Sequence, residues 1–156
     1  MSDRSTPPSS VRFSSPLLES GAKAVSHSVL PLTTDEHVVA LRRTVRERAL
    51  EIKLSLVDQT KLVTAASELA RNTIKYGGGG EVHVVSLSDG VRYGVRLAFA
   101  DDGPGIPDLQ LALTDGYTTG GGLGLGLSGA KRLVDEFDID TRPGEGTIVV
   151  IVKWKR

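Results

Sequence analysis

Glycine is concentrated in residues 99–137, and this concentration restricts the possible fold more than any other feature of the sequence. The segment contains an Asp-x-Gly-x-Gly turn and then a run of glycines at every second position: Asp101, Gly103 and Gly105, followed by Gly122, Gly124 and Gly126. Glycine loses more conformational entropy on folding than other residues, so a domain keeps it where the backbone turns sharply or approaches another group closely. The second run leads into a helical pattern, and the unpaired N–H groups at a helix start bind anions. The segment therefore predicts a binding site for a phosphate-bearing ligand.

Three widespread glycine motifs do not explain this segment. Gly124, Gly126 and Gly129 spell G-x-G-x-x-G, but the dinucleotide fingerprint requires a strand directly before it, and here a polar Gly- and Thr-rich segment precedes it. A P-loop requires Lys after its last glycine, whereas Gly129 is followed by Ala130. The His-Arg-Asp and Asp-Phe-Gly motifs of eukaryotic-type protein kinases are absent from the sequence.

The composition is that of an ordinary globular protein of 156 residues, a length that suits one domain. Nineteen basic residues balance nineteen acidic ones, so the charge does not favour binding to nucleic acid or to a membrane surface. The absence of cysteine excludes disulfides, zinc–thiolate sites and thiol catalysis. No apolar run approaches the ~20 residues of a membrane span, and the N-terminus lacks the pattern of a secretory signal. We therefore expect a cytoplasmic protein.

Residues 1–26 are rich in Ser and Pro and show no sustained hydrophobic period, so we predict a disordered tail followed by a folded domain over residues 27–156. The tail is either an extension without function or a regulatory arm.

A short strand is predicted over residues 27–32. Thr33 and Glu36 then resemble a capping box, and apolar residues recur at helical spacing from 38 to 52. The other side of this helix is either a solvated face or a docking surface for an acidic partner, and it carries Arg42, Arg43, Arg46 and Arg48.

A second helix is predicted over residues 57–76, where the glycine run 77–80 ends it. Glu68 and Asn72 are four residues apart and therefore lie on one helix face. An Asn oxygen can ligate Mg²⁺, and a Glu can orient or deprotonate a nucleophile. The same pair also fits an ordinary exposed helix surface, so spacing alone assigns it no role.

Two strands are predicted over residues 81–87 and 91–100, joined by a Ser-Asp-Gly turn. Asp101 continues the apolar side of the second strand, where a carboxylate is unusual unless something hydrogen-bonds to it. A helix over 125–137 and a strand over 138–142 follow, and a central strand over 147–154 is apolar on both sides. This order of elements predicts an α+β fold, namely a two-layer α/β sandwich whose mixed, mostly antiparallel sheet carries helices on one face.

With these residues placed, the chain resembles the Bergerat-type (GHKL) ATP-binding superfamily over about residues 30–154. ELARNTIKY resembles its N-box, DDGPGIPD its first glycine box, GLGLGL its second, and GEGT its late Gly-x-Gly-Thr. The resemblance implies that Asp101 accepts the adenine amino group with support from Thr147, and that Asn72 holds Mg²⁺ against the triphosphate of ATP. It implies a short ATP lid over residues 113–121 and backbone that closes around the nucleotide at Gly103, Gly105, Gly122, Gly124 and Gly126.

Glu68 indicates which group of the superfamily the chain resembles most. Histidine-kinase domains usually have Asn there, whereas the small anti-sigma and switch-protein serine kinases have a glutamate that is the proposed catalytic base. SELARN, the lid and the C-terminal Lys-Trp are most similar to the RsbT group. The resemblance thus implies a protein serine/threonine kinase that phosphorylates a STAS-domain protein in a bacterial stress-response or other signalling pathway, with a PP2C-type phosphatase as a second partner. The alternative is an anti-sigma factor of the RsbW or SpoIIAB type, which mainly sequesters a sigma factor.

Overall fold

The computed structural model describes residues 15–19, 21–114 and 126–156. In chain order its elements are β1 (Lys23–Leu32), α2 (Asp35–Glu51), α3 (Leu56–Lys75), β2 (Gly80–Ser88), β3 (Tyr93–Asp101), α4 (Leu109–Ala112), α5 (Gly126–Arg132), β4 (Glu136–Arg142) and β5 (Gly146–Trp154). The order is the predicted one, with α4 as an additional short helix. The second run of glycines (Gly122 and Gly124) and most of the predicted lid lie outside the described residues.

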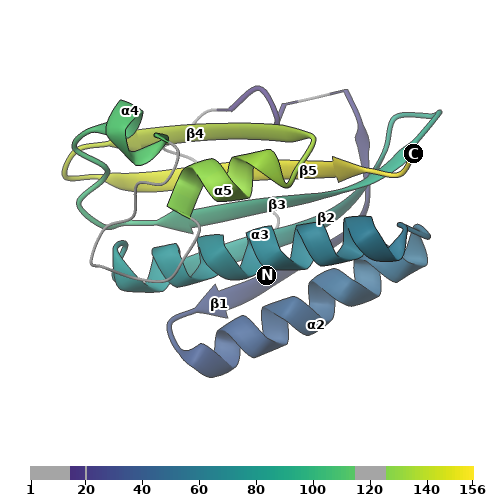
Figure 1. The fold of residues 1–156 in the computed structure, drawn as a ribbon, viewed down its shortest axis with the longest axis horizontal. Helices are drawn as coiled ribbons and strands as arrows, with labels where there is room; N and C mark the ends of the chain where they lie inside the picture. The colour runs from purple at the N-terminus through teal and green to yellow at the C-terminus, as the bar shows by residue number, and fades with distance from the viewer. Residues whose placement is uncertain (1–14, 20, 115–125) are drawn as a thin grey trace, which may run out of the picture.

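The strands form one sheet in the order β1-β2-β3-β5-β4 (Figure 1). All four pairings between these strands are antiparallel, so the described sheet is antiparallel throughout. β5 lies between β3 and β4, and every one of its residues is buried. This agrees with the apolar residues on both of its sides, which are typical of a strand that is covered on two faces.

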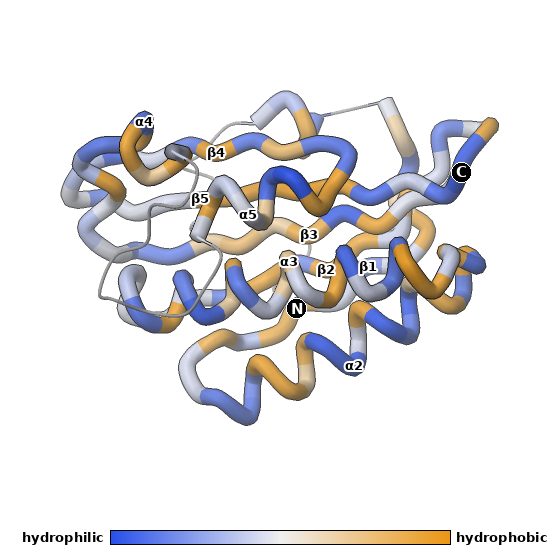
Figure 2. The backbone as a smooth tube through the Cα atoms, in the orientation of Figure 1, coloured by the Kyte–Doolittle hydropathy of each residue, from blue (hydrophilic) through white to orange (hydrophobic). Residues whose placement is uncertain are grey.

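Helices α2, α3 and α5 cover one face of the sheet, as predicted (Figure 1). α2 and α3 each turn one apolar side towards the strands, and polar and apolar segments alternate along both helices in Figure 2. The sheet contributes the inward residues of β2, β3 and β5 to this core, among them Val84, Leu97, Phe99 and Ile151. No helix within the described ranges has the length and apolar character of a membrane span.

Two helix boundaries differ from the prediction. The N-cap of α2 is Thr34, not Thr33, and the residue that completes the capping box is His37, not Glu36. His37 replaces the expected acid because its Nδ1 accepts the backbone N–H of Thr34 at 3.3 Å. The helix predicted over 125–137 ends at Arg132, since the chain pairs with β5 directly afterwards.

The opposite face of the sheet is covered in part by residues that the sequence assigned to the tail. β1 begins at Lys23, four residues before the predicted start of the strand. Leu17 and Leu18 pack on this face, and a nitrogen of Arg96 (Nη1) donates to the carbonyl oxygen of Leu17 at 3.1 Å. The apolar residues beneath them are Val85, Leu87, Ala98, Ala100, Ile148, Val150, Val152 and Trp154. The sheet is therefore buried on two faces, which explains the apolar character of both sides of β5.

We expect the double substitution Leu17→Ala and Leu18→Ala to lower the free energy of unfolding by about 2 kcal/mol, because a fully buried Leu→Ala change costs about 2–5 kcal/mol and both leucines are only partly buried. Urea unfolding followed by circular dichroism measures the change. The exposed neighbour Glu19 provides the control, since Glu19→Ala removes no apolar contact. An unchanged urea midpoint in the double variant would show that this segment does not contribute to the fold.

Candidate functional site

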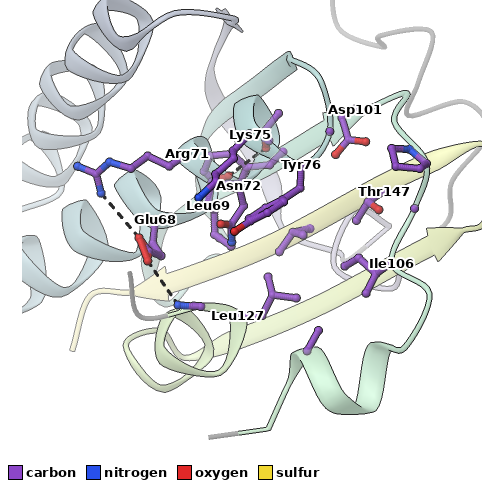
Figure 3. Close-up of a pocket in the computed structure, with 18 of the residues that line it drawn as sticks. Glu68, Leu69, Arg71, Asn72, Lys75, Tyr76, Asp101, Ile106, Leu127 and Thr147 are labelled. Carbon is purple, nitrogen blue, oxygen red and sulfur yellow. Dashed lines mark hydrogen bonds and ion pairs between the residues drawn. The ribbon is translucent and has the colours of Figure 1, made fainter. Parts of the chain in front are cut away.

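The C-terminal half of α3 and the ends of β3 and β5 enclose a pocket of about 430 Å³ (Figure 3). The segment that follows β3 forms another of its walls. The pocket is lined by Glu68, Leu69, Arg71, Asn72, Thr73, Lys75, Tyr76, Gly77, Phe99, Asp101, Pro104, Gly105, Ile106, Pro107, Ala112, Gly126, Leu127, Thr147 and Val149. Six of the predicted site residues line it together: Glu68, Asn72, Asp101, Gly105, Gly126 and Thr147. They come from four separate parts of the chain.

Asp101 is the last residue of β3 and lies opposite Thr147 in the β3–β5 register. Its Oδ1 accepts the backbone N–H of Gly103 at 2.9 Å. Burial raises the pKa of this carboxyl, although hydrogen bonds from Gly103 and Thr147 oppose the rise. The sequence analysis expected a carboxylate at this position to need hydrogen-bond donors. Backbone N–H groups provide them for Asp101. The neighbouring Asp102 is exposed, as its opposite position on the strand predicts.

Glycines around Asp101 allow the end of α3, the segment after β3 and the end of β4 to lie close together. A Cβ atom on Gly77 would overlap the side chain of Asp101, and a Cβ on Gly103 would lie 2.7 Å from the Gly77 backbone. Gly105 has a φ of 81°, and its Cβ would lie 2.7 Å from the carbonyl oxygen of Arg142. Side chains at these positions would therefore push the end of α3, the segment after β3 and the end of β4 apart. The sequence indicated Gly77 only as a helix stop and missed this role.

Thr147 belongs to a chain of hydrogen bonds behind the pocket. Its hydroxyl lies 2.8 Å from that of Thr141 on β4, and Thr141 Oγ1 accepts the backbone N–H of Ile106, also at 2.8 Å. These bonds connect the two C-terminal strands to the wall formed by Ile106. No sequence pattern indicated Thr141, because the hydroxyl of Thr147 comes within hydrogen-bond distance only when β4 and β5 pair.

Glu68 and Asn72 lie further along the pocket, on α3. Glu68 is only 7% exposed, so the alternative of an ordinary exposed surface does not hold for it. Its Oε1 lies 3.4 Å from the backbone nitrogen of Gly126, the first residue of α5, and its Oε2 lies 3.7 Å from Nη1 of Arg71. Figure 3 shows Glu68 and Asp101 well apart in the pocket. The seven residue steps of α3 from Glu68 to Lys75 alone correspond to about 10 Å.

The pocket has an apolar lining that the sequence did not assign to a site. Leu69, Phe99, Ile106 and Val149 all line the pocket, and none of them was predicted as a site residue. The pocket thus combines apolar walls, the half-buried acceptor Asp101 at one part, and the carboxylate of Glu68 with the carboxamide of Asn72 at another. Such a set suits a flat, partly polar ring system joined to an anionic group.

Among the described residues, no cluster of three or more His, Asp or Glu side chains is arranged to hold a metal ion. Asn72 is therefore the one predicted metal ligand that the pocket contains. Mg²⁺ commonly takes one or two protein ligands and completes its shell with water and substrate phosphates, so this donor set fits an ion that arrives with a phosphorylated ligand.

Comparisons with known proteins find similar sequences. The profile of a family described as histidine kinase-, DNA gyrase B-, and HSP90-like ATPase matches residues 57–156. The serine/threonine-protein kinase RsbT of Bacillus subtilis (strain 168) is 42% identical over 129 residues, which cover 83% of this chain and 97% of the relative. The anti-sigma F factor of Bacillus licheniformis is 32% identical over 120 residues, which cover 72% of this chain and 80% of the relative.

Two solved structures share the fold. The crystal structure of the RsbU and RsbW domains of Rv1364c from Mycobacterium tuberculosis matches 84% of this chain with a TM-score of 0.58 at 24% identity, and the match spans 32% of that longer chain. The mycobacterial sensor histidine kinase MprB matches 84% of this chain and 99% of its own, with a TM-score of 0.50 at 22% identity. At these identities the likeness bears on the fold alone.

The contact between Gly77 and Asp101 leads to a first prediction for the site. We expect Gly77→Ala to weaken the binding of adenine nucleotides at least tenfold while the protein stays folded, because the new methyl group must displace the Asp101 carboxylate. Isothermal titration calorimetry with ADP measures the affinity. Gly78→Ala is the matched control, since a Cβ there meets nothing within 4 Å and only the positive φ of 75° is strained. Equal affinities in the two variants would contradict the prediction.

The raised pKa of Asp101 leads to a second prediction. Because burial disfavours the ionised carboxyl, the contribution of this group to stability is complete below the ordinary Asp pKa of about 4 and is lost as the pH rises through the folded-state pKa. Asp101→Asn should therefore unfold at a higher urea concentration than the wild type at pH 7, and the difference should disappear towards pH 3.

Asp89 provides a control of opposite sign for this experiment. Backbone hydrogen bonds from Arg92 and Val91 lower its pKa, so its contribution is present at neutral pH and is lost as the pH falls. Asp89→Asn should unfold at a lower urea concentration than the wild type at pH 7. A lower midpoint for both variants would show that the Asp101 carboxylate stabilises the fold.

Proposed function

Because the chain belongs to the histidine kinase-, DNA gyrase B- and HSP90-like ATPase family, we propose that it is an ATP-dependent protein serine/threonine kinase of the RsbT type. The observation that carries this proposal is that Glu68, a buried carboxylate, lies in the same pocket as Asn72 and Asp101. A nucleotide-binding pocket that also contains a second carboxylate has the means to act on a hydroxyl as well as to bind ATP. The identity of 42% with a serine/threonine-protein kinase supports the same conclusion.

In this proposal the adenine base lies at the Asp101 part of the pocket. Its exocyclic amino group donates to the Asp101 carboxylate, and Thr147 supports the same edge of the base. The apolar side chains of Ile106 and Val149 provide surface against which a ring packs. The phosphates then extend along α3 towards Asn72 and Glu68. The glycines at 122, 124 and 126 belong to this proposal as the backbone that closes around the phosphates, with Gly126 at the start of α5.

Asn72 would hold Mg²⁺ through its side-chain oxygen, with the phosphates of ATP as the other ligands. When bound, the ion neutralises charge on the transferred phosphoryl group. Orientation of the nucleotide is left to the pocket itself, above all to Asp101 and the backbone around Gly103 and Gly105.

Glu68 is the proposed general base. Its carboxylate accepts the proton of a serine or threonine hydroxyl while the hydroxyl oxygen bonds to the γ-phosphorus of ATP. The bond from the γ-phosphorus to the bridging oxygen breaks, and ADP leaves with that oxygen. Positioning and charge stabilisation account for most of the catalysis in phosphoryl transfer, so a single well-placed base is sufficient.

We propose a STAS-domain protein as the substrate, a PP2C-type phosphatase as a further partner, and a cytoplasmic role in a bacterial stress-response or signalling pathway. These finer assignments rest on the similarity to RsbT. The second candidate function is sequestration of a sigma factor, which the 32% identity with an anti-sigma F factor favours. Both functions use the same nucleotide site, so the phosphorylated product distinguishes them.

Glu68→Gln tests the proposal directly. We expect phosphate transfer from radiolabelled ATP to a STAS-domain protein of the same genome to fall at least about 100-fold, because a general base contributes about 10²–10⁴ to the rate. The affinity for ATP should stay within about threefold, since the amide keeps the shape of the side chain. Asp101→Asn is the contrasting variant and should lose both transfer and binding.

If Glu68→Gln transfers phosphate at the wild-type rate, Glu68 is not the general base. If the wild type binds ATP but labels no STAS-domain protein, and instead retains a sigma factor in a pull-down, sequestration becomes the better assignment.

A further inference from the structure

Arg71 lies one helical turn after Glu68 on α3, and its guanidinium reaches back to the carboxylate. The side chain of Glu68 is 9% exposed, whereas that of Arg71 is 58% exposed. Figure 3 shows Arg71 on the side of Glu68 that faces away from Asp101. Arg71 therefore lies between the buried carboxylate and the solvent from which a protein substrate arrives.

The two oxygens of Glu68 have different partners. Oε1 faces the backbone nitrogen of Gly126 at 3.4 Å, and Oε2 faces Nη1 of Arg71 at 3.7 Å. Both distances exceed the 2.7–3.2 Å of a tight hydrogen bond. A carboxylate has about four sites that accept hydrogen bonds, so these two long contacts orient the group without occupying it. A hydroxyl that reaches Glu68 can still donate its proton there.

Among the described residues, Arg71 is the cation that forms an ion pair with Glu68. Lys75, the next cation along this side of α3, lies over the ring of Tyr76, with Nζ 5.3 Å from the ring centroid. The start of α5 contacts Oε1 from one side, and among the described residues Arg71 is the ion-pair partner of Oε2. Without Arg71, the carboxylate keeps only the contact at Oε1 and is less firmly oriented.

We propose that Arg71 is a positioning residue for Glu68, which fixes the orientation of the Glu68 carboxylate within the pocket. This inference rests on the proposed kinase function and assigns it one more residue. Arg71 acts through the base and contributes little to nucleotide affinity. Its effect should therefore appear in kcat and not in the KM for ATP.

The kinetic test compares Arg71→Gln, Arg71→Lys and the control Lys61→Gln. We expect Arg71→Gln to lower kcat about 10-fold, as expected for a displaced catalytic group, with the KM for ATP within about twofold. Arg71→Lys should recover most of the rate, because an ammonium group can hold Oε2 as well. Lys61→Gln removes the same charge from an exposed position two turns before Glu68 and should not change kcat. In a Glu68→Gln background, Arg71→Gln should slow transfer no further.

Two kinetic results would overturn the inference. A KM for ATP at least tenfold higher in Arg71→Gln, with kcat unchanged, would make Arg71 a nucleotide contact. Unchanged kcat and KM would show that the orientation of Glu68 does not depend on Arg71.

A second measurement does not depend on kinase activity. Carbodiimide with an amine labels accessible carboxyl groups, and mass spectrometry reads the rate at Glu68. Because Arg71 covers Oε2, we expect labelling of Glu68 in nucleotide-free protein to be at least threefold faster in Arg71→Gln than in the wild type and in Lys61→Gln. Equal rates would overturn the inference. If the wild type transfers no phosphate, the proposed function fails, while the labelling rates still decide whether Arg71 holds Glu68.

Discussion

The packing of α3 across the sheet is the interaction on which the rest of the structure depends. Three alanines on the buried side of the helix, Ala65, Ala66 and Ala70, let its backbone approach the strands closely, and Leu62 and Leu69 fill the space between them. This contact sets the height of α3 above β3 and β5, and so the width of the pocket. A bulkier residue in place of an alanine would lift the helix and open the site.

The end of α3 also lies close to the sheet, where it contacts a residue of the site. Gly77 follows Tyr76, the C-cap of the helix, and its backbone lies against the Asp101 side chain at the end of β3, where no second side chain would fit. Two carboxylates then lie in one pocket in different surroundings. Asp101 is half-buried and accepts backbone N–H groups, whereas Glu68 is buried and faces a cation and the start of α5. Different surroundings can give two carboxyl groups different tasks, which is consistent with the proposed roles of Asp101 in adenine recognition and of Glu68 in proton transfer.

Periodicity and glycine spacing predicted most of the fold, because burial on one side imposes a period of 3.6 on helices and 2 on strands. The prediction was wrong where tertiary contacts compete with local pattern. Residues Glu136 and Phe137 continue a helical period but pair with β5 instead. Leu17 and Leu18 lie in a Ser- and Pro-rich segment, and their burial depends on a sheet face that no local pattern describes.

The sequence by itself determined the residue types of the site and their order, since a carboxylate four residues before an Asn, and an Asp-x-Gly-x-Gly turn after an apolar strand, are local patterns. Only the tertiary structure decided that Glu68 is buried, that Gly77 must be small and that Arg71 faces Glu68 from the solvent side. The physical reason is that burial, close approach and the choice of ion-pair partner depend on distances between side chains. Those distances exist only after α3, α5 and the sheet have packed together.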